Sequence, residues 1–316
     1  KWWKRYHQTH PDYFAKTPPD VTQPSPSPRT FKLCVSNPEV AEQIIAQWTS
    51  AGRPDVWNVC PNDGAGYCIC ERCCALDAVQ HPSTAAVWRG YAPLTGRYVA
   101  LWNTLVKRMR RENPGVRLCS YAYHTYGQPL PGMRLEKGLY LGLVPGYDEK
   151  HLWHNWQHAG ANLLLRPNWW HAGAIAPHLP LHEAGNFFRF AQEHRMVGFD
   201  FDAILGHWGT QGAFYYLIAR LSTHPELTVD EVIDEYALAF GAAGDTVKEY
   251  LEYWESFSMR AAYPRFTGGG VMRNPEGLYA LAHRKHGLPG SHHDSGWLIL
   301  PYLYTDDVLA GATAIL

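Results

Sequence analysis

An aspartate and a cluster of cysteines follow a short strand near residue 60. Residues 55–60 are typical of a short buried strand, and Pro61-Asn62-Asp63-Gly64 predicts the turn that ends it. Reactive groups of parallel α/β folds lie at the carboxyl ends of the strands. Asp63 is therefore a candidate catalytic carboxylate and Asn62 a candidate substrate ligand. The alternative is that the Asp63 side chain only holds the turn.

The loop after this turn contains four cysteines in the order Cys68-X-Cys70-X2-Cys73-Cys74. Three or four thiolates can bind a structural Zn²⁺, and the same residues can form disulfides in an exported protein. Adjacent Cys73 and Cys74 cannot easily pair with each other, and the usual paired CxxC knuckles are absent, so both roles stay open. A catalytic cysteine is a third interpretation. Zinc or disulfides would fix a long loop beside Asp63.

Further carboxylates stand at the ends of later predicted strands, at Asp148, Asp200 and Asp202. Strand alternation in Phe199-Asp-Phe-Asp202 places both aspartates on one face, where like charges raise one pKa and keep that carboxyl group protonated. Hydrolysis of a glycosidic bond needs two acid groups on either side of the bond. The alternative is that one of these aspartates caps a helix or pairs with Arg166.

Aromatic and histidine side chains accompany these carboxylates. The chain has 13 Trp, 19 Tyr and 17 His, a surplus that suits a cleft for flat, hydroxyl-rich ligands. We expect Trp169 and Trp170 to form a sugar subsite, because adjacent rings in a loop are hard to bury together. Core packing and structural hydrogen bonds are the alternatives for the whole group. The candidate substrate ligands are Asn62, Tyr123, His124, Trp169, Trp170, His207 and Trp208.

Strands and helices alternate from residue 31 to residue 222. Helices are predicted to begin after the Asn37 cap and to cover 98–112, 149–158, 183–195 and 209–222. The alternation favours a parallel sheet, and polar residues at every strand end favour a (β/α)8 TIM-like barrel over a doubly wound sheet. Two strands would then precede Lys1. The predicted strands are 31–36, 55–60, 117–123, 138–144, 161–166 and 196–202.

Three regions are predicted along the chain. Residues 1–30 form a proline-rich, irregular lead-in, and residues 31–222 form the barrel. Residues 223–316 form a helical extension, which begins at the capping box Thr228-Val-Asp-Glu231. Because the chain begins without Met and stops in a predicted helix, we expect a fragment of a longer protein.

Composition narrows the function classes. The chain has 28 Lys and Arg against 29 Asp and Glu, and its basic cluster at 107–111 lies opposite an apolar helix face, which is typical of a solvated surface. Nucleic acid is therefore not an expected partner. No uninterrupted apolar segment is long enough to span a bilayer. With 46% hydrophobic residues in 316, the chain can bury a full core, and its oligomeric state is not predicted.

Several motifs carry a family resemblance. They are His10-Pro-Asp-Tyr-Phe14, Pro61-Asn-Asp-Gly-Ala-Gly-Tyr-Cys-Ile-Cys-Glu-Arg-Cys73, Tyr121-Ala-Tyr123 and the segment from Gly198-Phe-Asp-Phe-Asp202 to Gln211-Gly212. With these motifs the chain resembles bacterial glycoside hydrolase family 163, whose barrel is similar to those of family 20 hexosaminidases and family 67 α-glucuronidases. The resemblance implies an endo-β-N-acetylglucosaminidase acting on N-glycans, with catalysis assisted by the acetamido group of the substrate.

The sequence thus predicts an exported, extracellular or periplasmic glycoside hydrolase with a carbohydrate as its partner. Asp202 or Asp200 would be the acid, and Asp63 or Asp148 would activate water or orient the acetamido group. No catalytic cofactor is expected, and a structural zinc at the cysteines is the one metal considered. A non-catalytic carbohydrate-binding barrel is the first alternative, since no strand end carries a Glu. A metal-dependent hydrolase, favoured by the His count, is the second.

Overall fold

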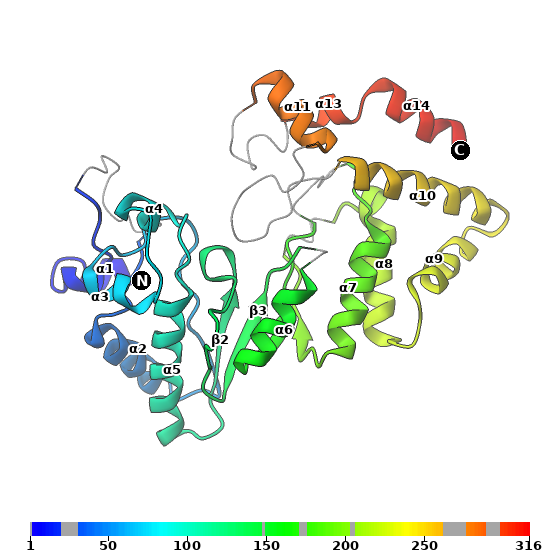
Figure 1. Cartoon of the computed structure of the whole chain (residues 1–316). Coiled ribbons are helices and arrows are strands. Elements are labelled where there is room, and N and C mark those ends of the chain that lie inside the picture. The colour runs from blue at the N-terminus through cyan, green and yellow to red at the C-terminus, as the bar shows by residue number, and fades with distance from the viewer. Residues whose placement is uncertain are drawn as a thin grey trace. The chain divides into compact units, whose positions relative to one another are not determined.

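The computed structural model has a mixed α/β fold with a five-stranded sheet (Figure 1). It describes residues 2–19, 31–146, 149–170, 176–202, 206–261, 276–288 and 298–316. The sheet order is β1-β2-β3-β4-β5, the same as the order along the chain, as in an α/β barrel. The strands are β1 (Val56–Asn58), β2 (Arg117–Ala122), β3 (Leu139–Leu143), β4 (Asn162–Leu165) and β5 (Gly198–Phe199).

Helices separate most of these strands, which confirms the predicted alternation. β1 pairs in parallel with β2, and β2 in parallel with β3, where Leu118 lies opposite Leu139. The closed eight-stranded barrel stays a prediction. The helices up to Thr223 are α1 (Trp2–Tyr6), α2 (Pro38–Ser50), α3 (Glu71–Leu76), α4 (Thr84–Arg89), α5 (Thr95–Glu112), α6 (Lys150–Ala159), α7 (Leu181–Glu193) and α8 (Trp208–Thr223).

The chain forms two compact units. The first contains the described residues of Lys1–Val144 and His151–Leu164, and the second those of Pro145–Lys150, Leu165–Phe266 and Gly270–Leu316. The predicted division into regions at residues 30 and 222 stays a prediction. Beyond Thr223 the described regular elements are all helical. They are α9 (Val229–Leu238), the 3-10 turn Gly241–Ala243, α10 (Gly244–Ala261), α11 (Leu278–His286), α13 (Leu300–Leu303) and α14 (Asp306–Ile315).

Helix α5 supplies much of the core of the first unit. Its inward face repeats every three to four residues, and Trp102, Leu105 and Met109 are fully buried on it. This face packs against β2, β3 and helix α2. The helix ends at Asn113, as the Asn-Pro-Gly sequence predicts.

Helix α2 begins as its sequence signals predict. The side chain of Asn37 accepts a hydrogen bond from the backbone N–H of Glu39, and Pro38 occupies the first helical position, where no partner for its missing N–H is needed. Helix α9 also begins as its sequence predicts, because Thr228 and Glu231 form the expected capping box.

The predicted strand at residues 31–36 is wrong. This segment forms only an isolated antiparallel bridge between Phe14 and Leu33. Groups from loops make the hydrogen bonds that a neighbouring strand would make. The N–H of Cys34 donates to the carbonyl of Tyr13, and the Asn62 amide donates to the carbonyl of Phe31. With its polar groups satisfied in this way, the segment needs no sheet.

Both edge strands are shorter than predicted, and β1 is less buried than the sequence indicates. β1 is three residues long, and Val56 is 50% exposed. β5 contains only Gly198 and Phe199, and the latter is 44% exposed. An edge strand pairs on one side only, so fewer neighbours cover its side chains. The central strands β2 and β3 match their predicted positions closely.

Among the residues that the structure describes, no helix is both long and apolar enough to cross a membrane.

Candidate metal centre and strand-end groups

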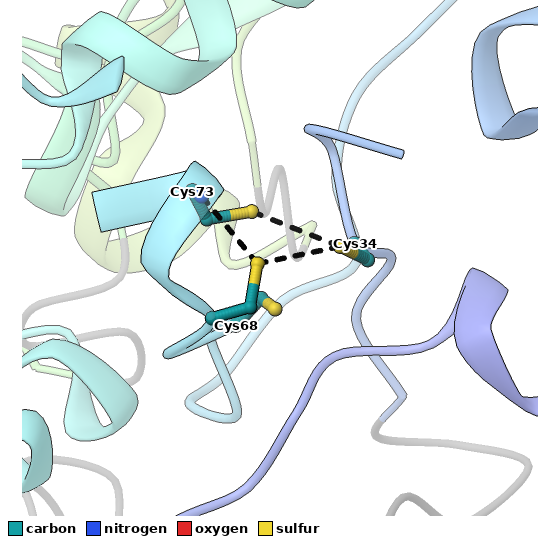
Figure 2. A group of neighbouring side chains, drawn as sticks. Cys34, Cys68 and Cys73 are labelled. Atoms are coloured by element: carbon teal, nitrogen blue, oxygen red, sulfur yellow. Dashed lines mark hydrogen bonds between the residues drawn. The ribbon is translucent and has the colours of Figure 1, made fainter. Parts of the chain in front are cut away.

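Four cysteine sulfurs gather in the first unit, at Cys34, Cys68, Cys70 and Cys73. All four sulfurs lie within 4.8 Å of one another, and the group is largely buried. The Sγ of Cys34 is 3.7 Å from that of Cys70 and 3.9 Å from that of Cys73. Figure 2 shows the Cys34 side chain from one segment and the Cys68 and Cys73 side chains from another, all pointing toward one another. All seven cysteines of the chain carry free thiols in this structure.

Backbone geometry holds these sulfurs in place. Cys70 is the N-cap of α3, and its Sγ accepts from the backbone N–H of Cys73 at 3.4 Å. The backbone N–H of Lys16 donates to the Sγ of Cys68 at 3.3 Å, so the N-terminal segment also orients the cluster. The cluster therefore joins three segments that are distant in the sequence.

The distances fit a tetrahedral zinc site. Zinc–sulfur bonds of about 2.3 Å in a tetrahedron place the sulfurs about 3.8 Å apart. The Sγ–Sγ distances of 3.7 and 3.9 Å agree with this spacing. Hydrogen bonds with Cys68 and Cys73 lower the pKa of the Cys34 thiol. The hydrogen bond with Cys34 raises the pKa of Cys68 to about 12, and the bonds with Cys34 and Cys68 raise the pKa of Cys73.

The structure corrects the predicted ligand set at one position. Cys74 lies outside the four-cysteine group and forms a second group with Asp77 and His81. Cys73 and Cys74 are neighbours in α3, and successive residues of a helix point about 100° apart. The two side chains therefore cannot face the same ion. Cys34 takes the fourth position. No local spacing signal in the sequence links it to a loop 34 residues further on.

Arg97 anchors the cysteine loop to α5. This side chain is 1% exposed, and its guanidinium donates to both carboxylate oxygens of Asp77, at 2.7 and 2.6 Å. A third N–H donates to the backbone carbonyl of Cys68 at 2.6 Å. Burial opposes its charge, but the hydrogen bonds and charge of Asp77 raise the pKa of Arg97. Gly96 permits this approach, since a Cβ there would lie 2.2 Å from the Leu76 carbonyl oxygen.

Asp63 follows β1 and is exposed. Tyr123 and His124 follow β2 in the same unit and are half-buried, as expected for strand-end groups. Burial lowers the pKa of His124, while the charge of Asp63 raises it, so the two groups interact across the strand ends. Asn62 is exposed, and its amide also donates to the carbonyl of Phe31 at 2.9 Å. The turn after β1 therefore has a structural use as well.

Lys32 is a further charged group beside Asp63 that sequence reasoning missed. It is 3% exposed, and its Nζ lies 4.6 Å from the centre of the Tyr67 ring. Burial lowers the pKa of Lys32 to about 8, although the charge of Asp63 raises it. A lysine inside a predicted strand gives no signal of its burial, because that burial depends on residues that fold over it.

The candidate aspartates of the second unit lie after β5 rather than in it. Asp200 is exposed, and its backbone N–H donates to the carbonyl of Leu165 at 2.9 Å. The Asp202 carboxylate forms an ion pair with Arg166 at 2.8 Å, which confirms the alternative of pairing with that arginine. The expected strand alternation at 199–202 is wrong, because β5 ends at Phe199. Asp148 lies outside the described residues.

The expectation that Trp169 and Trp170 are hard to bury together is wrong. Both rings are buried, at 5% and 4% exposure. Phe201 and Phe214 contact both of them, with ring centres 4.5 to 6.5 Å apart. Helix α8 and the segment after β5 supply these neighbours, which the local sequence did not show. A role in sugar binding for either ring stays untested.

His207 and Trp208 stand at the start of α8. His207 is the residue before the helix, and Trp208 is its first residue. The Trp208 ring is 66% exposed and meets Tyr215 edge to face at 5.1 Å. An exposed indole of this kind can stack on a sugar ring.

Comparisons with known proteins place the chain in a family. The family model described as "Domain of unknown function (DUF4838)" matches residues 3–252. No curated protein and no solved structure matches the chain. The matched region includes the four-cysteine group, Asp63 and the strand-end groups of both units.

Proposed function

The chain belongs to the DUF4838 family, and from that premise we propose that it is a glycoside hydrolase in which Asp63 acts as a catalytic carboxylate. The observation that supports this most is the strand-end group of the first unit. Asp63 is exposed after β1, and Tyr123 and His124 follow β2. An exposed carboxylate beside a half-buried imidazole and phenol, at adjacent parallel strand ends, is suited to acid–base chemistry on a hydroxyl-rich ligand.

The proposal includes the finer features that the sequence predicts. The resemblance to glycoside hydrolase family 163 suggests an N-acetylhexosamine-containing glycan as substrate and an exported protein. The sequence-ordered parallel strands support a complete (β/α)8 barrel. Asp148, Asp200 and Asp202 stay predictions for the second acid group. A mechanism assisted by the acetamido group would give Asp63 the task of orienting that group.

Replacing Asp63 with asparagine tests this proposal. Removal of a catalytic carboxylate is expected to lower kcat by about 100-fold or more, because positioned acid–base groups contribute that much. The measurement is release of glycan from N-linked glycopeptides by the full chain, followed by mass spectrometry. Asp307→Asn is the matched control, since Asp307 is an exposed aspartate on α14. Unchanged turnover in Asp63→Asn would refute the proposed role.

A separate outcome distinguishes the binding alternative. If the wild-type chain binds glycans but cleaves none, it is a carbohydrate-binding barrel rather than a hydrolase. Binding that survives in Asp63→Asn together with lost turnover supports catalysis by this residue.

We also propose that Cys34, Cys68, Cys70 and Cys73 bind one structural Zn²⁺. The tetrahedral spacing of the sulfurs is the supporting observation. All four positions belong to protein thiols, so this ion would have no open coordination site and no catalytic part. The ion would fix the loop that follows Asp63.

Metal analysis of the full chain tests the zinc proposal. Protein purified without added metal is expected to contain about one zinc per chain, because four thiolates form a closed structural site. Inductively coupled plasma mass spectrometry gives the content, and alkylation of the denatured chain counts its thiols. Absence of zinc together with fewer than seven alkylated cysteines would favour disulfides instead.

A further inference from the structure

The Lys32 ammonium has no hydrogen-bond partner in the described part of the chain. Its Nζ is shielded from solvent, and the whole residue is 3% exposed. An ammonium has three N–H donors, and leaving them unmet in a buried place costs free energy. Such a group persists where something outside the fold satisfies it.

The surroundings of Lys32 hold the side chain in place without neutralising it. Its backbone carbonyl accepts from the N–H of Ala15 at 3.0 Å, and the neighbouring Phe31 carbonyl accepts from the Asn62 amide. The Tyr67 ring lies beneath the ammonium, with its centre 4.6 Å from Nζ. Asp63 is near enough to interact with the charge, yet no ion pair between the two is present among the described residues.

Lys32 also borders a cavity of about 170 Å³. One water needs roughly a tenth of this space. Polar side chains of Asn58 and Asn62 line the cavity beside apolar groups, a composition common in small-ligand sites. The flexible four-carbon stem of a lysine allows Nζ to leave the Tyr67 ring and meet a ligand there.

We propose that Lys32 is an anion subsite that binds a negatively charged oxygen group, a carboxylate or a sulfate, on the carbohydrate ligand. The inference rests on the proposed function for the class of ligand, and it deepens that function by naming an acidic sugar. A carboxylate or sulfate would accept charge-assisted hydrogen bonds from the ammonium and supply the partners that the described residues do not provide. With the ligand bound, Asp63 lies beside the carboxylate or sulfate of the sugar and not in contact with the Lys32 ammonium.

Titration of the full chain with matched sugars tests this proposal. The probes are methyl glucuronide, glucose 6-sulfate and the neutral methyl glucoside, with affinities from calorimetry. We expect the wild-type chain to bind at least one charged sugar about tenfold or more tightly than the neutral one, the size expected for a hydrogen bond to a charged group. The two charged probes separate a carboxylate from a sulfate ligand.

Lys32→Met is the decisive variant. It keeps most of the length of the side chain, removes the charge, and is expected to abolish the preference for charged sugars while leaving a folded chain. Lys107→Met is the control, because Lys107 is exposed and pairs with Glu136 on the surface. A thermal melt of both variants separates lost binding from lost folding. If Lys32→Met does not fold, the preference for charged sugars is measured in Lys32→Arg, which retains a charge.

Equal affinity for charged and neutral sugars in the wild type would overturn the inference, as would a preference that persists in Lys32→Met. Loss of neutral and charged binding alike in a folded Lys32→Met would mean that Lys32 supports Asp63 instead, which also overturns it. If no glycan is cleaved but the charge preference is present and depends on Lys32, the proposed hydrolase fails and the anion subsite stands. If neutral glycans are cleaved and no charge preference is present, the proposed hydrolase stands and the anion subsite fails.

Discussion

Replacing Arg97 with methionine is expected to lower the free energy of unfolding by about 3–5 kcal/mol. The substitution leaves the Asp77 carboxylate, which is 0% exposed, without its two guanidinium donors, and it leaves the Cys68 carbonyl without its partner. A buried charge whose partner has been removed is among the costliest single changes in a protein. His81 alone, at 2.6 Å from Asp77, cannot replace a bidentate arginine. Urea unfolding followed by fluorescence measures the loss.

Two further variants separate this effect from a general loss of charge. Arg53→Met removes an exposed pair with Glu112 and is expected to cost less than about 1 kcal/mol. Asp77→Leu combined with Arg97→Met removes both charges, and should recover much of the stability lost in Arg97→Met, because an apolar pair needs no desolvation of ions. Equal unfolding midpoints for Arg97→Met and Arg53→Met would contradict the role assigned to this anchor.

Local sequence signals predicted the helices that have a periodic apolar face or a capped N-terminus. Helix α5 follows from its 3.6-residue repeat, because a continuous apolar stripe can only be buried against a sheet or another helix. Helices α2 and α9 follow from Asn37 and from Thr228, since their caps satisfy N–H groups within the same few residues. These features depend on neighbours in the sequence, so the sequence alone shows them.

Elements at the edge of the sheet could not be predicted in the same way. The segment 31–36 has strand-like residues, but its pairing depends on Phe14 and Asn62, which reach it from elsewhere in the chain. β1 has the composition of a buried strand and yet exposes half of Val56. Whether a strand is central or at an edge is a tertiary property, and composition does not record it.

Part of the candidate site was also predictable from local sequence signals, and part depends on long-range folding. Cys68, Cys70 and Cys73 are close in sequence, and a loop with a helix N-cap brings them together, so their grouping was predictable. Cys34 and Lys32 join the site through long-range folding, and no spacing pattern marks either. The burial of Trp169 was missed for the same reason, because its covering rings come from later segments.

Replacing Cys34 with serine is expected to remove the metal and to lower the free energy of unfolding by about 3 kcal/mol. Zinc bound by thiolates contributes folding free energy directly, since the unfolded chain has no preformed site. A loss of one of four ligands that weakens binding about 100-fold corresponds to about 2.7 kcal/mol. Cys34 carries the only ligand from the segment before α2, so the variant also frees that segment from the loop containing Cys68 and Cys70.

Cys74→Ser is the matched control, because Cys74 neighbours Cys73 but lies outside the four-sulfur group. It is expected to retain one zinc per chain and nearly the full free energy of unfolding. A strong chelator should lower the stability of the wild type and of Cys74→Ser to that of Cys34→Ser, while leaving Cys34→Ser itself unchanged. If Cys74→Ser loses the metal and Cys34→Ser keeps it, the ligand set is wrong. If a thiol reductant destabilises the wild type and a chelator does not, the cluster works through disulfides, and its free energy comes from constraint of the unfolded chain rather than from an ion.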